Sequence, residues 1–388
     1  MGYGLSVPPS DEPSESDASP SDSSFLHRTP KEERPPFSGA LGTTDDPDAA
    51  AAETARRTDE RTSDEPEPAR VAAVVYNPIK VDIDVLRATV DAAEKAAGWG
   101  ETVWFETSEE DPGGGVTKEA LARGIDVVMA AGGDGTVRAV AEALRDSGVP
   151  IGLLPSGTGN LLARNLALTL DNLEESVTTA FAGDERKIDL GVVDIARAEG
   201  PRETYVFLVM AGLGLDAQMI ANTNPALKKK VGWIAYVDAI FKSLRQNNRI
   251  HMRYNLDGRG NRNARVHTIL IGNCGSLPGN ILLLPDAAVD DGVFDIVALR
   301  PEGIIGWLEV WVKIVWENGV LRRSQVGRKI LSLTKEIRTV RYLKGKELIV
   351  RLTEEQEFEL DGDGFGRIVA LKAVVDPGAL RVKVPAAA

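Results

Sequence analysis

The sequence has very few of the side chains that build most metal and redox sites. Among its 388 residues are one cysteine, Cys274, and three histidines, His27, His251 and His267. A single cysteine excludes an internal disulfide and any metal site made of several thiolates. The chemistry of the chain must therefore rest on carboxylates and backbone groups.

The sequence also lacks a membrane-spanning run and an excess of positive charge. No apolar run approaches the roughly 18 residues that cross a bilayer, and no signal-peptide pattern opens the chain, so we expect a cytoplasmic protein. The net charge is -13, but residues 71–388 carry only -4, with 42 acidic and 38 basic side chains. Nucleic acid is excluded as a general partner, because phosphate contacts need a basic excess.

The first 70 residues have few large apolar side chains. They hold ten of the 21 prolines, with 16 acidic and 7 basic residues. Such a segment cannot bury enough surface to offset the entropy lost on ordering. We therefore predict a disordered acidic tail over residues 1–69.

From residue 70 onward, short apolar runs alternate with segments of helical periodicity. The predicted strands are 71–76, 102–107, 125–131 and 151–154, and the predicted helices are 82–97, 117–123, 136–145 and one from Asn160. Asp82 or Asp84 is the expected N-cap of the first helix. This alternation predicts a parallel, doubly wound α/β domain over residues 70–185.

After Asp184 the pattern changes to strands separated by turns. The predicted strands are 187–196, 204–210, 249–256, 265–271, 293–299, 336–343, 347–352 and 368–374. Two stretches, 227–244 and 304–318, have helical spacing instead. We predict a largely antiparallel second domain over residues 186–378.

Two glycine-rich loops follow neighbouring predicted strands. The first is Gly132-Gly133-Asp134-Gly135-Thr136, and the second runs from Pro155 to Asn160 with the sequence PSGTGN. Glycines let backbone N–H groups approach a polyphosphate, and a helix N-terminus adds positive partial charge. Parallel strands bring both loops to one edge, where ligands bind. Tight turns without a ligand remain the alternative.

Other nucleotide-binding patterns are missing: the sequence has no Walker A motif, no set of protein-kinase motifs and no dinucleotide fingerprint after its first strand. GGDGT followed by PSGTGN resembles the diacylglycerol kinase catalytic-domain family, which includes sphingosine, ceramide and bacterial lipid kinases. Further motifs in family order are Asn77-Pro78, Thr107, residues 188–191, residues 212–217, Gly272-Asn273, and residues 284–287 leading to Asp291-Gly292. The resemblance covers residues 71–388.

The resemblance implies a nucleotide-binding α/β domain, a C-terminal β-sandwich and a site in the cleft between them. A last strand at about residues 379–384 would return to the first domain. The residues expected at ATP are Asn77, Pro78, Thr107, Gly132, Gly133, Asp134, Gly135, Thr136 and Thr158, with Gly157, Gly159 and Asn160 shaping the second loop.

Asp134 favours chemistry over nucleotide storage. A carboxylate beside phosphates is repulsive unless Mg²⁺ or a proton-donating hydroxyl lies between them. Its structural alternative is an N-cap for the helix from Thr136.

The resemblance also implies a Mg²⁺ site at Asp291, with backbone carbonyls near Ala288 and Val293. Hard oxygen ligands suit this ion. As structure, the segment from Asp290 to Gly292 predicts a hairpin turn.

The family usually carries Asp-Gly-Glu where this sequence has Asp361-Gly362-Asp363, and the glutamate acts as general base. Asp363 is one methylene shorter, so reaching the acceptor would need a shift on the order of 1 Å or a water. A turn between two strands is the alternative role of this segment. Arg138 is a second departure, because the family usually has asparagine there.

We therefore expect an ATP- and Mg²⁺-dependent lipid kinase, with diacylglycerol as the first choice of acceptor and Asp363 and Asp134 as catalytic residues. The expected partner is a lipid substrate at the membrane surface, and a homodimer stays open. The basic start of the 227–244 stretch at Lys228–Lys230, or the stretch with Trp307, could contact lipid, although core packing explains both. An NAD kinase-like enzyme and a weakened nucleotide or lipid sensor are the rivals.

Overall fold

The computed structural model describes residues 69–214, 249–277, 281–300 and 340–386. Several predictions fall outside these ranges. They concern the acidic tail, residues 215–217 of one family motif, and the two stretches 227–244 and 304–318 considered for lipid contact.

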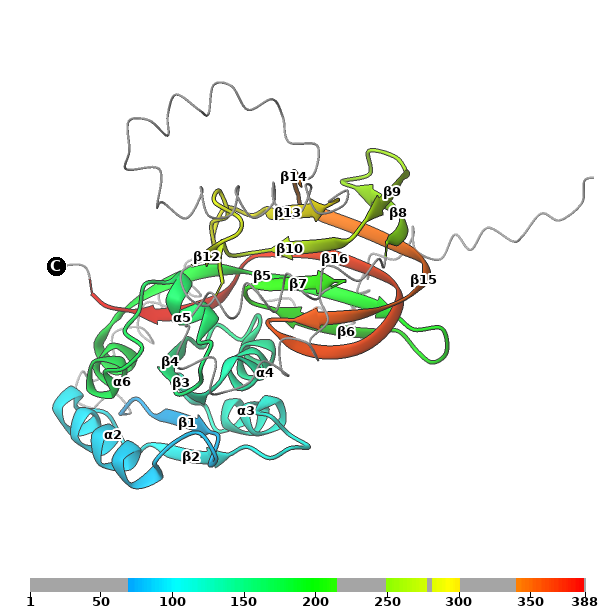
Figure 1. Cartoon of the computed structure of the whole chain (residues 1–388). Helices are drawn as coiled ribbons and strands as arrows, with labels where there is room; N and C mark the ends of the chain where they lie inside the picture. Colours follow the sequence, from blue (N-terminus) through cyan, green and yellow to red (C-terminus); the bar gives the residue numbers. More distant parts are fainter. Residues whose placement is uncertain (1–68, 215–248, 278–280, 301–339, 387–388) are drawn as a thin grey trace, which may run out of the picture. The chain divides into compact units, whose positions relative to one another are not determined.

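The α/β domain is built on four parallel strands. These are β1 (Ala72–Tyr76), β2 (Val103–Glu106), β3 (Val127–Gly132) and β4 (Ile151–Pro155), in the order β2-β1-β3-β4 (Figure 1). Every residue of β1 and β3 is buried. Continuous apolar runs are typical of parallel strands covered on both faces, so the predicted parallel sheet is confirmed.

Helices cover both faces of this sheet. They are α2 (Ile83–Ala97), α3 (Gly114–Ala122), α4 (Asp134–Leu144), α5 (Leu161–Asn165) and α6 (Leu173–Ala182). One core contains Val74 of β1 with residues of α2 and α6, whereas the next residue, Val75, lies in a second core with α3 and α4. Neighbouring strand residues point to opposite faces, which makes the domain doubly wound.

Two helices depart from the sequence prediction. Helix α3 begins at Gly114 rather than residue 117, because the Asp111 carboxylate accepts the N–H groups of Gly113, Gly115 and Val116. Helix α6 was not predicted separately. The Asn172 side chain accepts the Glu175 N–H and starts this helix, which follows the single helix predicted from Asn160.

The second part of the chain is a β-sandwich-like domain of antiparallel strands. They are β5 (Asp184–Ala196), β6 (Glu203–Phe207), β7 (Met210–Leu213), β8 (Ile250–Leu256), β9 (Arg262–Val266), β10 (Thr268–Gly272), β11 (Ser276–Leu277), β12 (Ile281–Leu282), β13 (Phe294–Leu299), β14 (Val340–Gly345), β15 (Glu347–Leu360) and β16 (Asp363–Val384). Phe207, Phe294 and Phe358 are fully buried in its core. Their burial identifies the inner faces of the sandwich.

Two strands predicted as single elements are interrupted in the structure. The predicted strand 204–210 divides into β6 and β7 at Leu208 and Val209, whose N–H groups turn to the Asp361 carboxylate. The predicted strand 265–271 divides into β9 and β10 at His267. In the first case, long-range hydrogen bonds to Asp361 end the strand pairing, and the periodicity of the sequence could not predict them.

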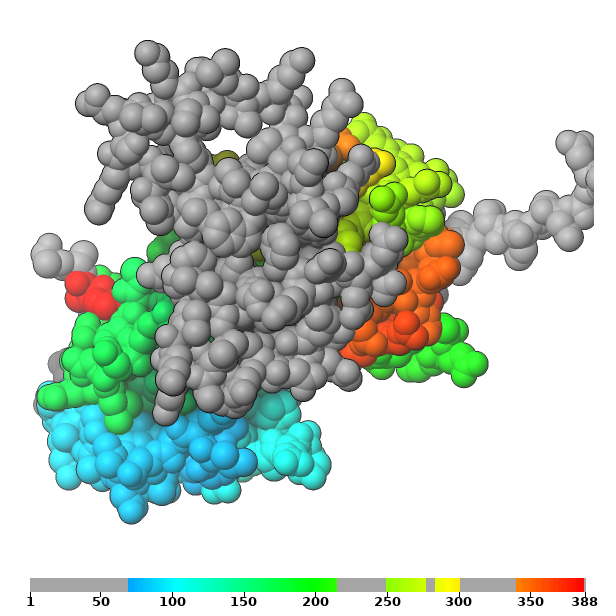
Figure 2. Space-filling view, in the orientation of Figure 1, coloured from blue at the N-terminus to red at the C-terminus, as the bar shows by residue number. Residues whose placement is uncertain are grey.

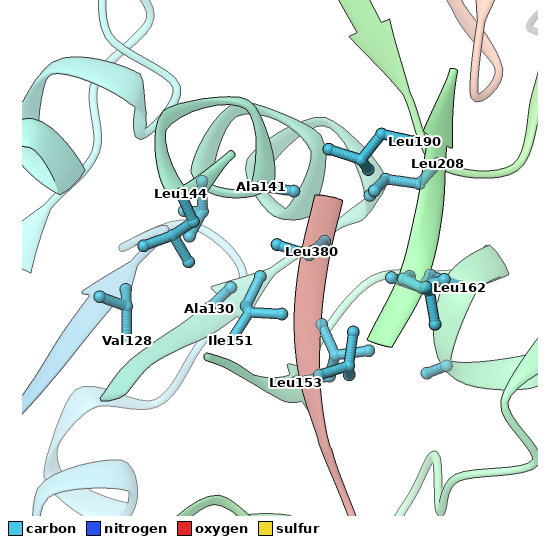
Figure 3. Close-up of a cluster of buried hydrophobic side chains, with 14 of the residues drawn as sticks. Val128, Ala130, Ala141, Leu144, Ile151, Leu153, Leu162, Leu190, Leu208 and Leu380 are labelled. Atoms are coloured by element: carbon cyan, nitrogen blue, oxygen red, sulfur yellow. The ribbon is translucent and has the colours of Figure 1, made fainter. Parts of the chain in front are cut away.

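Strands β5 and β16 connect the sandwich to the α/β domain. Strand β16 pairs with β5 from Ala370 to Val384 and also pairs in parallel with β4, where Val382 faces Ile151. Leu380 of β16 packs in the core that includes Ile151 and Leu153 of β4 (Figure 3). One sheet therefore runs from the α/β domain into the sandwich.

The surface carries few exposed large apolar side chains in the part of the chain described. Ile79, in the turn before α2, and Val85, in the first turn of α2, are the two that stand out, at 84% and 54% exposed. The yellow-green atoms of the β8 and β9 segment also lie at the surface (Figure 2). Within the described ranges, no helix is both long and apolar enough to cross a membrane.

Candidate active site

Four strand ends meet at one edge of the parallel sheet. Backbone hydrogen bonds join them in sequence: Thr107 N to Tyr76 O at 2.9 Å, Asn77 N to Ala131 O at 2.9 Å, and Ser156 N to Gly132 O at 3.1 Å. The glycine loops and the Asn77 and Thr107 positions thus share the carboxyl edge, where open α/β sheets bind ligands. Pro78 is exposed beside Asn77, and Thr107 is buried.

The first glycine loop turns directly into a helix. Gly133 is the N-cap of α4 and offers no side chain to its first turn. At Gly132, an added Cβ would lie 2.7 Å from Cβ and Oγ1 of Thr136, so only glycine fits under the buried threonine. The helix therefore presents its first amides and the positive end of its dipole to an anion.

The second loop packs against the first. A Cβ at Gly157 would lie 2.8 Å from the Gly133 Cα, so the two loops touch through glycine backbone. The Asn160 side chain closes the loop on itself, with Nδ2 donating to Gly157 O and Oδ1 accepting from Gly157 N, both at 3.0 Å. Thr158, at the tip, is exposed.

Asp134 joins the two loops. Its carboxylate accepts the Asn160 N–H at 3.0 Å and the Leu161 N–H at 2.6 Å. The alternative role considered for Asp134 is therefore wrong: it lies within α4, whose N-cap is Gly133, and it caps α5 instead. Burial raises the pKa of Asp134, these two hydrogen bonds oppose the rise, and the nearby Asp363 charge adds to it.

The two loops consequently differ in what they can offer a phosphate. The first amides of α5 are occupied by Asp134, whereas the start of α4 has no side-chain cap. Arg164, which sequence reasoning missed, donates from Nε to Gly159 O at 2.6 Å and braces the second loop. We interpret the first loop as the phosphate cradle and the second as its support.

Asp363 comes to the same place from the sandwich. It opens β16 after a two-residue turn, Asp361-Gly362, with φ values of 51° and 92°. Both positive values are typical of a tight hairpin, so the turn predicted here is confirmed. A Cβ at Gly135 would lie 2.8 Å from Oδ2 of Asp363, which places this half-exposed carboxylate over the first turn of α4.

Asp361, two residues earlier, is in contrast fully enclosed. Its carboxylate accepts the N–H groups of Leu208, Val209 and Met210 at 2.8 to 3.0 Å. Burial raises its pKa to about 6, with these hydrogen bonds and the Arg138 charge opposing the rise. Sequence reasoning treated Asp361 only as part of a turn, because nothing local indicates its partners.

The segment around Asp291 is not a hairpin, contrary to the prediction. It leads into β13, which pairs with β10 and β14, and its Gly292 N–H donates to the buried Asp189 at 2.7 Å. One oxygen of the exposed Asp291 accepts the Val293 N–H at 3.2 Å. The predicted Mg²⁺ site at Asp291 stays a prediction, for which a carboxylate is the hard oxygen ligand that this ion prefers.

Negative charge gathers around this turn. The Asp295 carboxyl pairs with Lys344 at 3.0 Å, and burial together with the Asp291 and Asp286 charges raises its pKa. Among the described residues no group of three or more His, Cys, Asp and Glu side chains could hold a metal ion. A cation here would therefore depend on Asp291 with backbone oxygens, including those near the exposed Ala288.

Comparison with known proteins assigns the chain to a family. Residues 72–193 match the model of the diacylglycerol kinase catalytic domain, and residues 208–315 match the YegS C-terminal NAD kinase beta sandwich-like domain. A "Probable lipid kinase YegS-like" protein of Pseudomonas fluorescens is 32% identical over 305 residues, which is 77% of this chain and 90% of the relative. The chain belongs to the diacylglycerol kinase catalytic-domain family.

One further relative and one solved structure are similar to the chain. A "Diacylglycerol kinase" of Bacillus subtilis is 25% identical over 301 residues, covering 76% of this chain and 91% of the relative. The crystal structure of a diacylglycerol kinase from Bacillus anthracis has a TM-score of 0.56 at 17% identity, covering 82% of this chain and 98% of that chain, and shows the same fold. Kinases of this family use ATP.

Proposed function

We propose that the chain is an ATP-dependent lipid kinase that transfers the γ-phosphate to a hydroxyl of diacylglycerol, forming phosphatidic acid. The observation that carries the proposal is the meeting of Asp363 with the uncapped start of α4, where the two glycine loops touch. The relatives named lipid kinase and diacylglycerol kinase support the choice of acceptor class.

In this proposal the triphosphate lies along the first loop. A Cβ at Gly133 would meet nothing closer than the Gly157 Cα at 3.9 Å, so the loop backbone is open to phosphate oxygens at this position. The first amides and the dipole of α4 attract the negative charge. Mg²⁺ enters with ATP as part of the substrate, and a second ion at Asp291 would lower the negative charge of that turn.

Asp363 acts as the base. The lipid hydroxyl oxygen attacks the γ-phosphorus, a new P–O bond forms, and the bond between the γ-phosphorus and the oxygen bridging to ADP breaks. The hydroxyl proton passes to the Asp363 carboxylate. Phosphoryl transfer depends mainly on positioning and charge neutralisation, which the loops and the Asp134 link supply.

The acceptor and product are membrane lipids, so the enzyme would act at a membrane surface as a peripheral cytoplasmic protein. Diacylglycerol is uncharged and enters with its hydroxyl at the headgroup level. A bilayer is therefore the natural partner of the proposed reaction.

Labelled transfer tests the proposal directly. The purified chain is incubated with Mg²⁺, γ-labelled ATP and vesicles containing diacylglycerol, and separately with NAD. Labelled phosphatidic acid is expected. Another labelled lipid would change the acceptor, labelled NADP would favour the dinucleotide kinase, and ATP binding without transfer would favour a sensor, which the short and half-exposed Asp363 motivates.

A further inference from the structure

Arg138 is a buried cation where α4 meets the β15–β16 hairpin. Its side chain is 11% exposed, and the guanidinium carbon lies 4.6 Å from the centre of the Phe365 ring. Its Nε is buried without a hydrogen-bond partner in the described part of the chain. Burying a guanidinium is unfavourable unless nearby anions compensate, so the surroundings of Arg138 matter.

Two carboxylates of the hairpin turn face this guanidinium. Nη2 of Arg138 lies 3.9 Å from Oδ2 of Asp363, and the Arg138 charge also acts on the buried Asp361. The distance to Asp363 is that of an ion pair rather than a direct hydrogen bond. Arg138 is therefore set beside the proposed base without occupying its oxygens.

The position of Arg138 on α4 explains this placement. It follows Asp134 by four residues, so both side chains lie on one side of the helix. Asp134 turns to the second loop, and Arg138 turns to the sandwich. Oδ2 of Asp363 therefore lies close to two parts of α4, the backbone at Gly135 and the guanidinium of Arg138.

We propose that Arg138 is a positioning residue that holds the Asp363 carboxylate over the first turn of α4. The inference rests on the lipid kinase function proposed above. The inference also links the two departures from the family pattern: Arg138 is longer than the usual asparagine, and Asp363 is shorter than the usual glutamate. The long Arg138 side chain extends from α4 toward the short Asp363 side chain on β16.

A double-mutant cycle tests the coupling. The variants are Arg138→Asn, Asp363→Glu and the two combined, assayed for labelled phosphatidic acid with KM for ATP and kcat determined separately. Arg138→Met keeps apolar volume against Phe365 and removes the charge. Arg123→Asn is the matched control, because Arg123 also stacks on a phenylalanine, with 5.0 Å to the Phe105 ring, but is the C-cap residue of α3.

Each single exchange at positions 138 and 363 should lower kcat at least about tenfold, with KM for ATP within about twofold of wild type. The kcat of the combined variant should be at least about tenfold higher than the value expected if the two single losses simply multiplied. The reason is that asparagine at position 138 leaves room for the extra methylene of glutamate at position 363. Arg138→Met should resemble Arg138→Asn, and Arg123→Asn should resemble wild type.

Multiplicative single effects, or full activity of Arg138→Met, would overturn the inference. Thermal unfolding identifies any variant that loses activity by losing its fold, and Arg138→Met then decides the question with packing retained. A wild-type chain that labels no lipid would instead refute the proposed function. The two failures are thus distinguishable.

Discussion

The α/β domain and the β-sandwich build the site in different ways. In the α/β domain, the candidate functional side chains directly follow strands. The Asp134 carboxylate accepts hydrogen bonds from backbone N–H groups that are only 26 and 27 residues later in the sequence. In the sandwich, Asp361 reaches amides 151 to 153 residues back in the chain. The first half is therefore organised by local turns, and the second by long-range hydrogen bonds.

The same chemical group serves both arrangements. Asp134 and Asp361 are carboxylates that accept backbone N–H groups, but Asp134 is only partly buried and Asp361 is 4% exposed. Removing the Asp134 carboxylate should mainly lower turnover, and removing the Asp361 carboxylate should mainly lower the free energy of unfolding. Four measurements test this contrast.

The largest effect is expected for Asp134→Ala. Loss of the carboxylate frees the Asn160 and Leu161 amides and displaces the second loop, so labelled transfer should fall roughly 10³-fold or more. The fold should persist, with about 1 to 2 kcal/mol lost as for other helix caps. Activity near the wild-type level would remove Asp134 from the site.

Asp361→Ala should have the next largest effect, on stability. It leaves three buried N–H groups without an acceptor, at a cost of about 4 kcal/mol in the free energy of unfolding. Urea unfolding at pH 5 measures this loss. Asp363→Ala is the comparison variant, expected to cost only about 1 kcal/mol, because it removes one half-exposed, partly solvated anion from beside the buried Arg138 guanidinium. Equal losses would contradict the contrast.

The raised pKa of Asp361, about 6, predicts a pH dependence. The folded chain then binds a proton that the unfolded chain releases near pH 4, so this stabilisation is complete below about pH 4 and lost as pH rises through about 6. The stability difference between wild type and Asp361→Ala should narrow by about 2 kcal/mol from pH 4 to pH 7. A difference that widens over this range has the wrong sign.

The smallest effect is expected from a methyl group between the loops. A Cβ at Gly159 would meet Oδ2 of Asp134, so Gly159→Ala should weaken ATP binding about tenfold by moving the carboxylate. Gly114→Ala in α3 is the matched control, because its Cβ meets nothing closer than the Ala139 carbonyl oxygen at 3.7 Å. Calorimetric titration with ATP compares the affinities of the two variants. Equal affinities would mean that ATP binding does not depend on close contact between the two loops.

Much of the α/β half could be predicted because its signals are local. The apolar run before Gly132 predicted β3, and the glycines after it predicted the turn into α4. Boundaries were less predictable, since Asp111 extends α3 from outside the helix. The sandwich strands were predicted in position better than in number, as the division of one predicted strand into β6 and β7 shows.

The site shows the same division. The glycine loops could be located from the sequence, but the capping of α5 by Asp134 and the Arg138–Asp363 pair could not. Asn273 is a further example: its Nδ2 donates to the carbonyls of Asp189 on β5 and of Leu208 between β6 and β7. Such partners are chosen by packing, and no spacing rule within one segment identifies them.

By itself, the sequence determined the strand–loop–helix units, because backbone preferences of glycine and the periodicity of apolar residues act over a few positions. The tertiary structure alone decided which carboxylates remain accessible. Asp361 and Asp363 are separated by one glycine, yet one is enclosed by three amides and the other lies over α4. Burial and hydrogen bonding depend on distant strands, so their difference arises only when β6, β7 and α4 meet the hairpin.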